Sequence, residues 1–242
     1  MIWNQFLKTI TIACSLIFAT SAYAGTLNKL GVTGFSPDGA YFAFEQYGVQ
    51  DGSGFPFSNI TIIDVIADKW VGGSPYKVVI EDDAQPALAA RQKVQGQAGD
   101  AIQNLGISSV NGGTVANNPI SQMGVEPDWM QFRPFLSTQN IGEPIEVTLE
   151  TYPLAGKANC EVYGPTYGFR LLLSKGGATQ TLHQDNKIPN SRGCPQSYRL
   201  DRIDAFITPD NNIVLAIMVM MYTPGFEGPA ATYLAITKQI PR

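Results

Sequence analysis

The sequence predicts a mostly β protein of the α+β class, built from antiparallel β-sheets in a sandwich-like or propeller-like arrangement. Three observations support this prediction. Short segments rich in β-branched and aromatic residues recur along the chain, separated by Gly, Pro, Asn and Asp. One stretch, near residues 84–105, has helical spacing instead. A hairpin-like pattern near the N-terminus also occurs near the C-terminus, which predicts pairing between neighbouring strands.

The first 24 residues are typical of a secretory signal peptide. Lys8 is followed by the apolar run TITIACSLIFAT and by SAYA, which ends at Ala24. A positive start, a short apolar run and small residues before the cut define such signals, and a permanent membrane span needs ~20 apolar residues. An uncleaved anchor and a lipoprotein attached at Cys14 are the alternatives. Cleavage after Ala24 would leave residues 25–242 as a single β-rich exported domain without a transmembrane segment.

Most of the β-type segments of this domain are rich in strand-favouring residues. In chain order they are YFAFEQY, NITIIDVIA, YKVVIED, PIEVTLETY, FRLLLSK, QTLHQD, YRLDRIDAFIT, IVLAIMVMMY and TYLAITKQ. In the run from Ile213 to Tyr222, the residues of both alternating sets are apolar. That pattern predicts a central strand that is buried on both faces.

Residues 84–105 predict one amphipathic helix. Acids precede this stretch, Pro86 lies in its first turn, and Gly106 follows its end. Apolar residues recur at helical spacing, namely Leu88, Val94, Ala98, Ala101, Ile102 and Leu105. A helix broken near Gly96 is the alternative, because glycine in a helix interior costs about 1 kcal/mol relative to alanine. Residues 108–123 are rich in Asn, Gly and Ser and predict a long loop.

The repeat consists of two copies with equal spacing. FSPDGAYFAF corresponds to ITPDNNIVLAI, and 25 residues separate Pro37 from Ile62, as they separate Pro209 from Leu234. Each copy predicts a long hairpin with a Gly- and Phe-containing loop. In the first copy the loop contains QDGSG, whose glycines suit the positive φ angles of a turn. A ligand-contacting loop that uses Asp51 is the alternative.

Charge and cysteine content restrict the partners and the chemistry. The formal net charge is −4, and basic residues form no cluster, so we expect no nucleic-acid partner. Once Cys14 leaves with the signal, Cys160 and Cys194 remain, which predicts one structural disulfide in an oxidising compartment. A zinc site would need further Cys or His ligands, and the chain has a single histidine. We therefore expect no metal and no cofactor.

The sequence resembles two known families. FSPDGAYFAF followed by NITIIDVIADKWV is similar to a blade of the TolB-type β-propellers, which repeat a Ser-Pro-Asp-Gly turn. The whole mature chain resembles the bacterial family of predicted secreted proteins known as domain of unknown function 2259. FAFEQYGVQDGSGFPFSNITIID, ANCEVYGPTYGFRL and HQDNKIPNSRGCPQSYRL carry this likeness. The resemblance implies a periplasmic or secreted bacterial protein with paired cysteines, and it implies no activity.

The residues themselves suggest two kinds of site and settle on neither. His183 is the single histidine, and its polar neighbours Asp185, Asn186 and Arg192 could build a small site around a general base or a ligand. A pair of carboxylates could act in hydrolysis, with candidates Glu45, Asp51, Asp64, Asp128, Asp204 and Glu227. Aromatic residues could line a sugar-binding face instead of a core, namely Trp70, Trp129, Phe132 and Phe135.

Two functional hypotheses follow from these patterns. The first is a non-enzymatic binding or envelope-associated protein whose partner is an unknown protein or small ligand of the cell envelope, because familiar catalytic motifs are missing from the sequence. The second is a periplasmic hydrolase that uses acidic residues or His183. A cleft that holds His183 beside an acid would favour the second hypothesis, and an apolar surface patch would favour the first.

Overall fold

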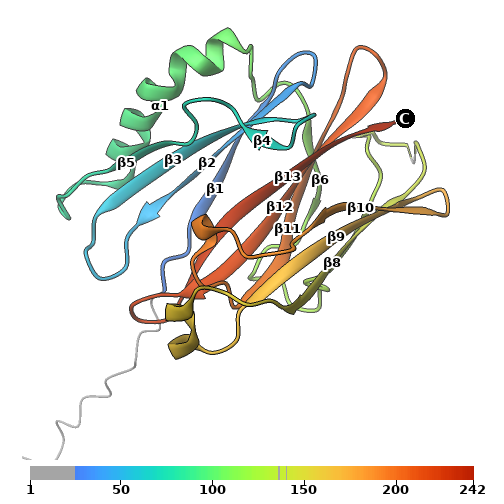
Figure 1. Ribbon diagram of the computed structural model, residues 1–242. Coiled ribbons are helices and arrows are strands. Elements are labelled where there is room, and N and C mark those ends of the chain that lie inside the picture. Colours follow the sequence, from blue (N-terminus) through green and yellow to red (C-terminus); the bar gives the residue numbers. More distant parts are fainter. Residues whose placement is uncertain (1–24, 136, 140) are drawn as a thin grey trace, which may run out of the picture.

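Three antiparallel sheets lie one on another in the computed structural model, and α1 (Ala87–Asn104) covers one side of the stack (Figure 1). The structure describes residues 25–135, 137–139 and 141–242. The predicted signal peptide, residues 1–24, lies outside the described residues. We call the layers, in order from α1, the helix-side sheet, the central sheet and the outer sheet. These layers match the sandwich-like form of the predicted fold class rather than its propeller-like form.

Each sheet is built mainly from strands that pair antiparallel with their neighbours. The helix-side sheet contains β1 (Lys29–Phe35), β2 (Tyr41–Val49), β3 (Pro56–Asp64), β4 (Lys69–Trp70) and β5 (Tyr76–Val79). The central sheet has the order β13 (Pro229–Pro241), β12 (Asn212–Pro224), β11 (Ser197–Ile207) and β6 (Gly113–Asn117). The outer sheet has the order β10 (Ala178–Gln184), β9 (Tyr167–Lys175), β8 (Ile145–Pro153) and β7 (Trp129–Phe132). Two short 3₁₀ helices, η1 (Ala158–Tyr163) and η2 (Asn190–Arg192), flank the outer sheet.

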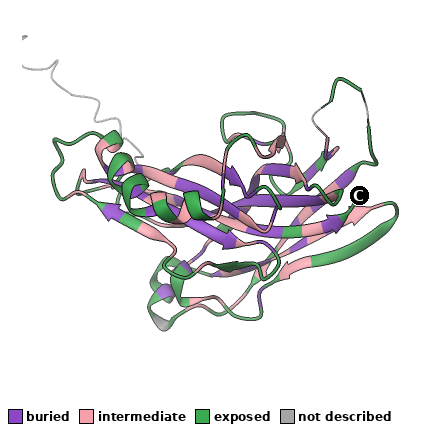
Figure 2. Cartoon of the chain, turned by 90° about the horizontal axis from the view of Figure 1, so that it is seen from above, coloured by how far each residue is buried: buried purple, intermediate pink, exposed green. Residues whose placement is uncertain are grey.

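The strand β12 holds the stack together because both of its faces are apolar. Leu215 and Ile217 belong to the core between the central and outer sheets. Ala216 and Met218 point the other way, into the core against the helix-side sheet. All four side chains are fully buried, and buried residues, coloured purple, run through the middle of the molecule in Figure 2. The predicted central strand, buried on both faces, is confirmed.

The helix α1 packs on the outer face of the helix-side sheet through small side chains. Ala90, Val94 and Ala98 are fully buried there and contact the cluster that contains Ile60 of β3. The predicted helix is confirmed, and it runs without a break through its glycines. Leu88, however, is 57% exposed, so the prediction that it belongs to the buried face is wrong. It lies two residues before the buried Ala90, about 200° round the helix, and therefore points away from the sheet.

The two predicted hairpins are confirmed. β2 pairs with β3, from Tyr41 opposite Asp64, and β12 pairs with β13 along their whole length. The strands extend further toward the loops than predicted, so the first loop is shorter, and Phe57 is buried within β3. The loops of the two hairpins contact each other, because the Glu227 N–H donates to the Asp51 carboxylate at 3.0 Å. Asp51 therefore serves a structural contact between the copies.

The prediction of a long loop over residues 108–123 is wrong in part. β6 lies within it and pairs with β11 at the edge of the central sheet. Gly112 leads into β6 with φ +87°, and a Cβ there would lie 2.7 Å from the Ala205 carbonyl oxygen. Only glycine fits this close approach without strain. The strand is short, and its pairing is made by the backbone, so its composition gives little sign of it.

Candidate functional site

A cleft of about 450 Å³ opens beside β13, between the helix-side sheet and the segment that follows β10. We call it the β13 cleft. Its floor is formed by residues 232–236 of β13. Its walls carry mostly polar side chains, and those used below are Gln46, Asn59, Thr61, Trp70, Lys77, His183 and Arg192. The volume lies within the range that small-molecule sites in proteins occupy.

The first wall results from the alternation of side chains along β3. Ile60 and Ile62 face α1, so the residues between them face the opposite side of the sheet. On that side Ile63 packs against the central sheet, whereas Asn59 and Thr61 line the cleft. One face of β3 is therefore apolar where the central sheet covers it and polar beside the open cleft.

The floor of the cleft is the free edge of β13, because β13 is the last strand of the central sheet. The β12–β13 ladder runs without a bulge, so the N–H groups of alternate residues point away from β12. The side chain of Gln46 binds this edge at Tyr233: it accepts the Tyr233 N–H at 2.7 Å and donates to the Tyr233 carbonyl at 2.9 Å. Gln46 thus takes the place that a residue of a neighbouring strand would occupy.

A second side chain binds the same edge further along. Asp68 lies between β3 and β4 with φ +47°, a left-handed conformation that Asp adopts more readily than most residues. Its carboxylate accepts the Thr237 N–H at 2.8 Å and the Thr237 hydroxyl at 3.0 Å. Gln46 and Asp68 therefore cover two stretches of the β13 edge on either side of Ala235.

The opposite wall is organised by the buried carboxylate of Asp185. It accepts hydrogen bonds from the Phe169 N–H at 3.0 Å, from Arg192 at 2.5 Å and from the His183 ring at 2.9 Å. Burial would raise the pKa of Asp185, but the hydrogen bonds from His183, Phe169 and Arg192 outweigh it, and the pKa is lowered. The structure thus brings His183, Asp185 and Arg192 together, as the polar cluster in the sequence suggested.

The rings around this cluster are packed closely. The His183 ring stacks on Phe169 with centroids 4.6 Å apart, and the Arg192 guanidinium lies 4.8 Å from the same Phe169 ring. Tyr198 is also beside Phe169, and burial raises its pKa to about 12, so its phenol stays neutral at physiological pH. His183 and Arg192 both reach the cleft from this packed base. Asn186 is exposed and has no described hydrogen bond to the cluster.

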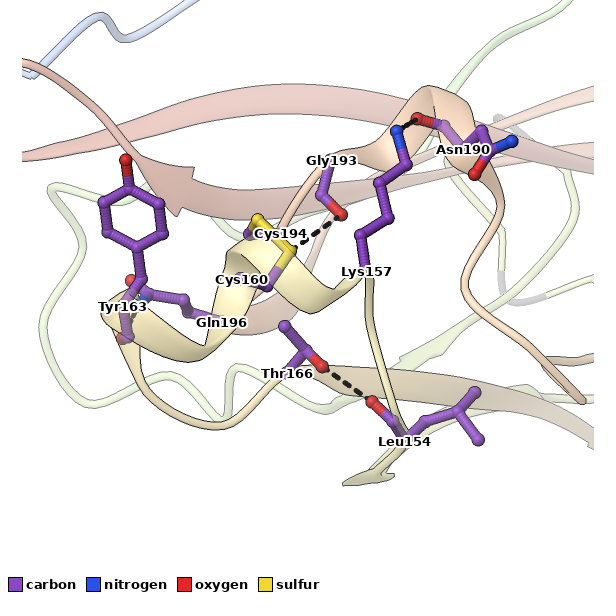
Figure 3. The surroundings of a disulfide bond; sticks show 9 residues. All are labelled: Leu154, Lys157, Cys160, Tyr163, Thr166, Asn190, Gly193, Cys194 and Gln196. Carbon is purple, nitrogen blue, oxygen red and sulfur yellow. Dashed lines mark hydrogen bonds between the residues drawn. A yellow bond between two sulfur atoms is a disulfide. The ribbon is translucent and has the colours of Figure 1, made fainter.

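The disulfide fixes the segment that carries this wall. The sulfurs of Cys160 and Cys194 are bonded, and their Cα atoms are 5.3 Å apart (Figure 3). The bond joins η1 to Cys194, which lies two residues after the end of η2. Lys157 donates to the Asn190 carbonyl in the same region. Closing a loop of 34 residues contributes about 3–4 kcal/mol in the chain-entropy description. The predicted disulfide is thus present, and it ties η1 to the segment that carries Arg192.

The carboxylates proposed for hydrolysis do not gather in one site. Glu45 is buried and forms a salt bridge with Arg91 of α1 at 2.8 Å. Asp204 binds Thr114 and Arg202, and Asp64 accepts a turn N–H within its own loop. Among the described residues, no group of three or more His, Cys, Asp or Glu side chains could hold a metal ion.

The four candidate aromatic residues are also separated. Trp70 is 57% exposed and lines the β13 cleft, whereas Trp129 lies on β7 of the outer sheet. Phe132 is buried, and Phe135 lies under the Arg242 guanidinium. One aromatic side chain of the four therefore belongs to the cleft.

The comparisons with known proteins agree with the resemblance seen in the sequence. Residues 43–239 match the family described as predicted secreted protein, domain of unknown function 2259. Because the match spans most of the chain, the chain belongs to this family, and it is a periplasmic or secreted protein. A search of curated proteins gives no significant match. Among the described residues, no helix has the length and apolar character to cross a membrane.

Sequence reasoning missed the residues that bind the β13 edge. Gln46 and Tyr233 are 187 positions apart, and Asp68 and Thr237 are 169 apart. The equal spacing within the repeat could have pointed to contacts between the two hairpins, but it does not say which side chains meet. The alternation of polar and apolar residues in NITII gave the only direct sign of the cleft wall.

Proposed function

We propose that this protein is an exported, non-enzymatic binding protein and that the β13 cleft holds a small polar ligand of the cell envelope. The observation that supports this best is the composition of the cleft. Amide, hydroxyl and charged side chains line a cavity large enough for a small molecule, and Trp70 offers an aromatic surface beside them. Such a lining favours a ligand that forms several hydrogen bonds.

The rigidity of both walls supports the same proposal. One wall is a sheet whose other face is covered by α1, and the other wall is held by a disulfide and by the Asp185 cluster. Pre-organised walls lose little conformational entropy on binding, which favours affinity. Rigid walls therefore favour ligand binding, both in a binding protein and in an enzyme.

The alternative, a periplasmic hydrolase that uses His183, has one observation in its favour. His183 lies beside Asp185 in the cleft, which is the arrangement of an oriented general base. Within the described residues, however, the Nε2–H of His183 donates to Asp185, Arg192 lies 3.4 Å from the same nitrogen, and no Ser, Thr or Cys side chain donates to the ring. Asp185 already accepts three donors. A binding role therefore fits this geometry better.

The proposal can be tested by looking for a retained ligand. We expect native mass spectrometry of the protein purified from the periplasm to show a small-molecule adduct. Asn59→Trp, which fills the cleft from the first wall, should remove the adduct. Thr181→Trp, at an exposed position of β10 in the outer sheet, is the matched control and should retain it.

Two outcomes would count against the proposal. An adduct that survives Asn59→Trp would place the ligand elsewhere. Turnover of ester, peptide or glycoside substrates that is abolished by His183→Asn would instead support the hydrolase.

A further inference from the structure

We propose that the ligand of the β13 cleft is a short oligopeptide and that one of its residues pairs with the backbone of Ala235. This inference rests on the proposed binding function and goes further, because it names the ligand class and the atoms that recognise it. The observation that supports it is the pattern of groups bound to the edge of β13. Side chains or backbone from elsewhere occupy this edge on both sides of Ala235.

The groups that point away from β12 alternate along β13. At Ala231 the N–H donates to the Thr26 carbonyl, and the Asn28 N–H donates to the Ala231 carbonyl. Tyr233 is bound by Gln46, and the Thr237 N–H is bound by Asp68. By the same alternation, the N–H and carbonyl of Ala235 point into the cleft.

Ala235 therefore stands between two covered positions. It is half-buried, and among the described residues no hydrogen-bond partner is found for its edge-facing N–H and carbonyl. Proteins commonly protect an exposed strand edge with charged side chains or by covering it. Gln239, further along β13, also lacks such a partner within the described part of the chain, but of these two edge-facing residues Ala235 is the one that lines the cleft.

The geometry of this opening favours a peptide over a ligand with a single secondary amide. In an antiparallel pair, one residue of the partner strand supplies both the carbonyl that accepts and the N–H that donates. A single secondary amide, such as the acetamido group of an amino sugar, is trans, and its N–H and C=O point in opposite directions. It could bind the N–H or the carbonyl of Ala235, but not both. A peptide satisfies both groups at once.

Gln46 provides a precedent for this arrangement in the same edge. Its primary carboxamide places N–H and C=O on the same side, and both bind Tyr233. Ala235, two residues further along β13, offers the same pair of backbone groups. The ligand residue would continue the line of backbone-like groups that Gln46 begins.

The flanking side chains set the length of the ligand. Because Gln46 and Asp68 occupy the edge at Tyr233 and Thr237, ladder pairing extends over one ligand residue. A long strand would have to displace both side chains. The cavity of about 450 Å³ then holds the residues on either side, between the wall with Lys77 and the wall with Arg192. A short free oligopeptide fits these limits better than a segment of a folded protein.

The test uses the whole mature protein and an equimolar library of N-acetylated tripeptide amides. Native mass spectrometry at about 1 mM library should show at least one retained peptide, since weak complexes of this kind have millimolar or lower Kd. The retained peptide is then compared with its ester analogue, in which the central N–H is replaced by oxygen. We expect the ester to bind about tenfold more weakly, because it cannot donate to the Ala235 carbonyl.

A second arm changes the protein. Ala235→Pro removes the edge-facing N–H without removing a hydrogen bond to β12, and edge strands tolerate proline at such positions. It should weaken the retained peptide about tenfold. Gln239→Pro is the matched control, at an edge-facing position outside the cleft, and it should leave the affinity unchanged.

The outcomes separate this inference from the proposed function. An ester analogue that binds as tightly as the amide would overturn backbone pairing, and this comparison does not depend on how well Ala235→Pro folds. If no tripeptide is retained but a disaccharide of N-acetylglucosamine binds, and Asn59→Trp abolishes that binding, the peptide inference fails and the binding function stands. Peptide binding that persists in Asn59→Trp would contradict both.

Discussion

At the scale of single residues, Asp185 accepts more hydrogen bonds than Asp68, the other carboxylate used in the candidate site. Its two oxygens accept three donors, and its partner Arg192 is also buried, with 9% of the side chain exposed. A buried ion pair is costly to break from one side, because the remaining charge has no partner. Asp185 therefore positions His183 and Arg192 at the cleft wall.

We expect Asp185→Asn to destabilise the protein by about 3–5 kcal/mol at pH 7, the usual cost of leaving one member of a buried pair without its partner. Urea unfolding followed by circular dichroism measures this difference. Asp210→Asn, at an exposed turn position, is the control and should change the free energy of unfolding by less than about 0.5 kcal/mol. An equal effect of both variants would show that the Asp185 cluster carries no special stability.

The pKa of Asp185 also predicts how this difference depends on pH. The folded pKa is lowered below the ordinary value of about 3.9, so the ionised carboxylate stabilises the folded state above that value. As the pH falls below about 4 and through the folded pKa, the contribution is lost. The gap between the wild type and Asp185→Asn should therefore narrow in acid. A gap that stays constant down to pH 2 would contradict the assignment.

The same cluster shows how far the sequence predicts the site. His183, Asp185 and Arg192 lie within ten positions, so their polarity alone marks them as neighbours. Gln46 cannot be found in this way, because its partner Tyr233 belongs to the other copy of the repeat. Contacts between a side chain and a distant strand edge leave no local pattern. The open edge at Ala235 follows only from the register.

At the scale of elements, α1 keeps two glycines that packing does not require. Within 4 Å of a Cβ placed on Gly96 or Gly99 there is no neighbouring atom outside the helix backbone. The helix is held by Ala90, Val94 and Ala98 and by the salt bridge between Arg91 and Glu45. Its glycines therefore cost conformational entropy without a compensating close approach.

Gly96→Ala should accordingly stabilise the protein by about 0.5–1 kcal/mol, the usual difference between the two residues in a helix interior. Thermal unfolding would show this as a higher Tm. Gly112→Ala is the opposite case, because its φ is +87° and a Cβ would meet the Ala205 carbonyl, so we expect destabilisation. A lower Tm for Gly96→Ala would contradict the conclusion that packing does not require this glycine.

Elements with a strong pattern could be predicted, and short edge strands could not. The β12 run is apolar on both faces, and both hairpins follow from the repeat. β6 is GTVAN, half-buried and flanked by glycine and asparagine, and its composition resembles that of a loop. It is a strand because the free edge of β11 offers hydrogen-bond partners. Tertiary pairing decides such segments more than propensity does.

At the scale of the whole molecule, the unequal extent of the layers creates the cleft. The central sheet ends at β13, whereas the polar part of the helix-side sheet continues beside it. The segment after β10 closes the other side and is joined to η1 by the disulfide. The stack of sheets in Figure 1 that buries β12 thus also leaves the edge of β13 beside the polar cleft.

Chemical-shift mapping of the uniformly ¹⁵N-labelled mature protein tests this account most directly. On addition of the low-molecular-mass fraction of a periplasmic extract, the amide signals that shift should cluster at Tyr233–Ile236, Asn59 to Thr61 and His183. The tips of the outer-sheet strands, such as Gly177, should stay unchanged. Shifts that gather on the outer sheet or the hairpin loops, with the β13 cleft unaffected, would contradict the claim that this cleft is the binding site.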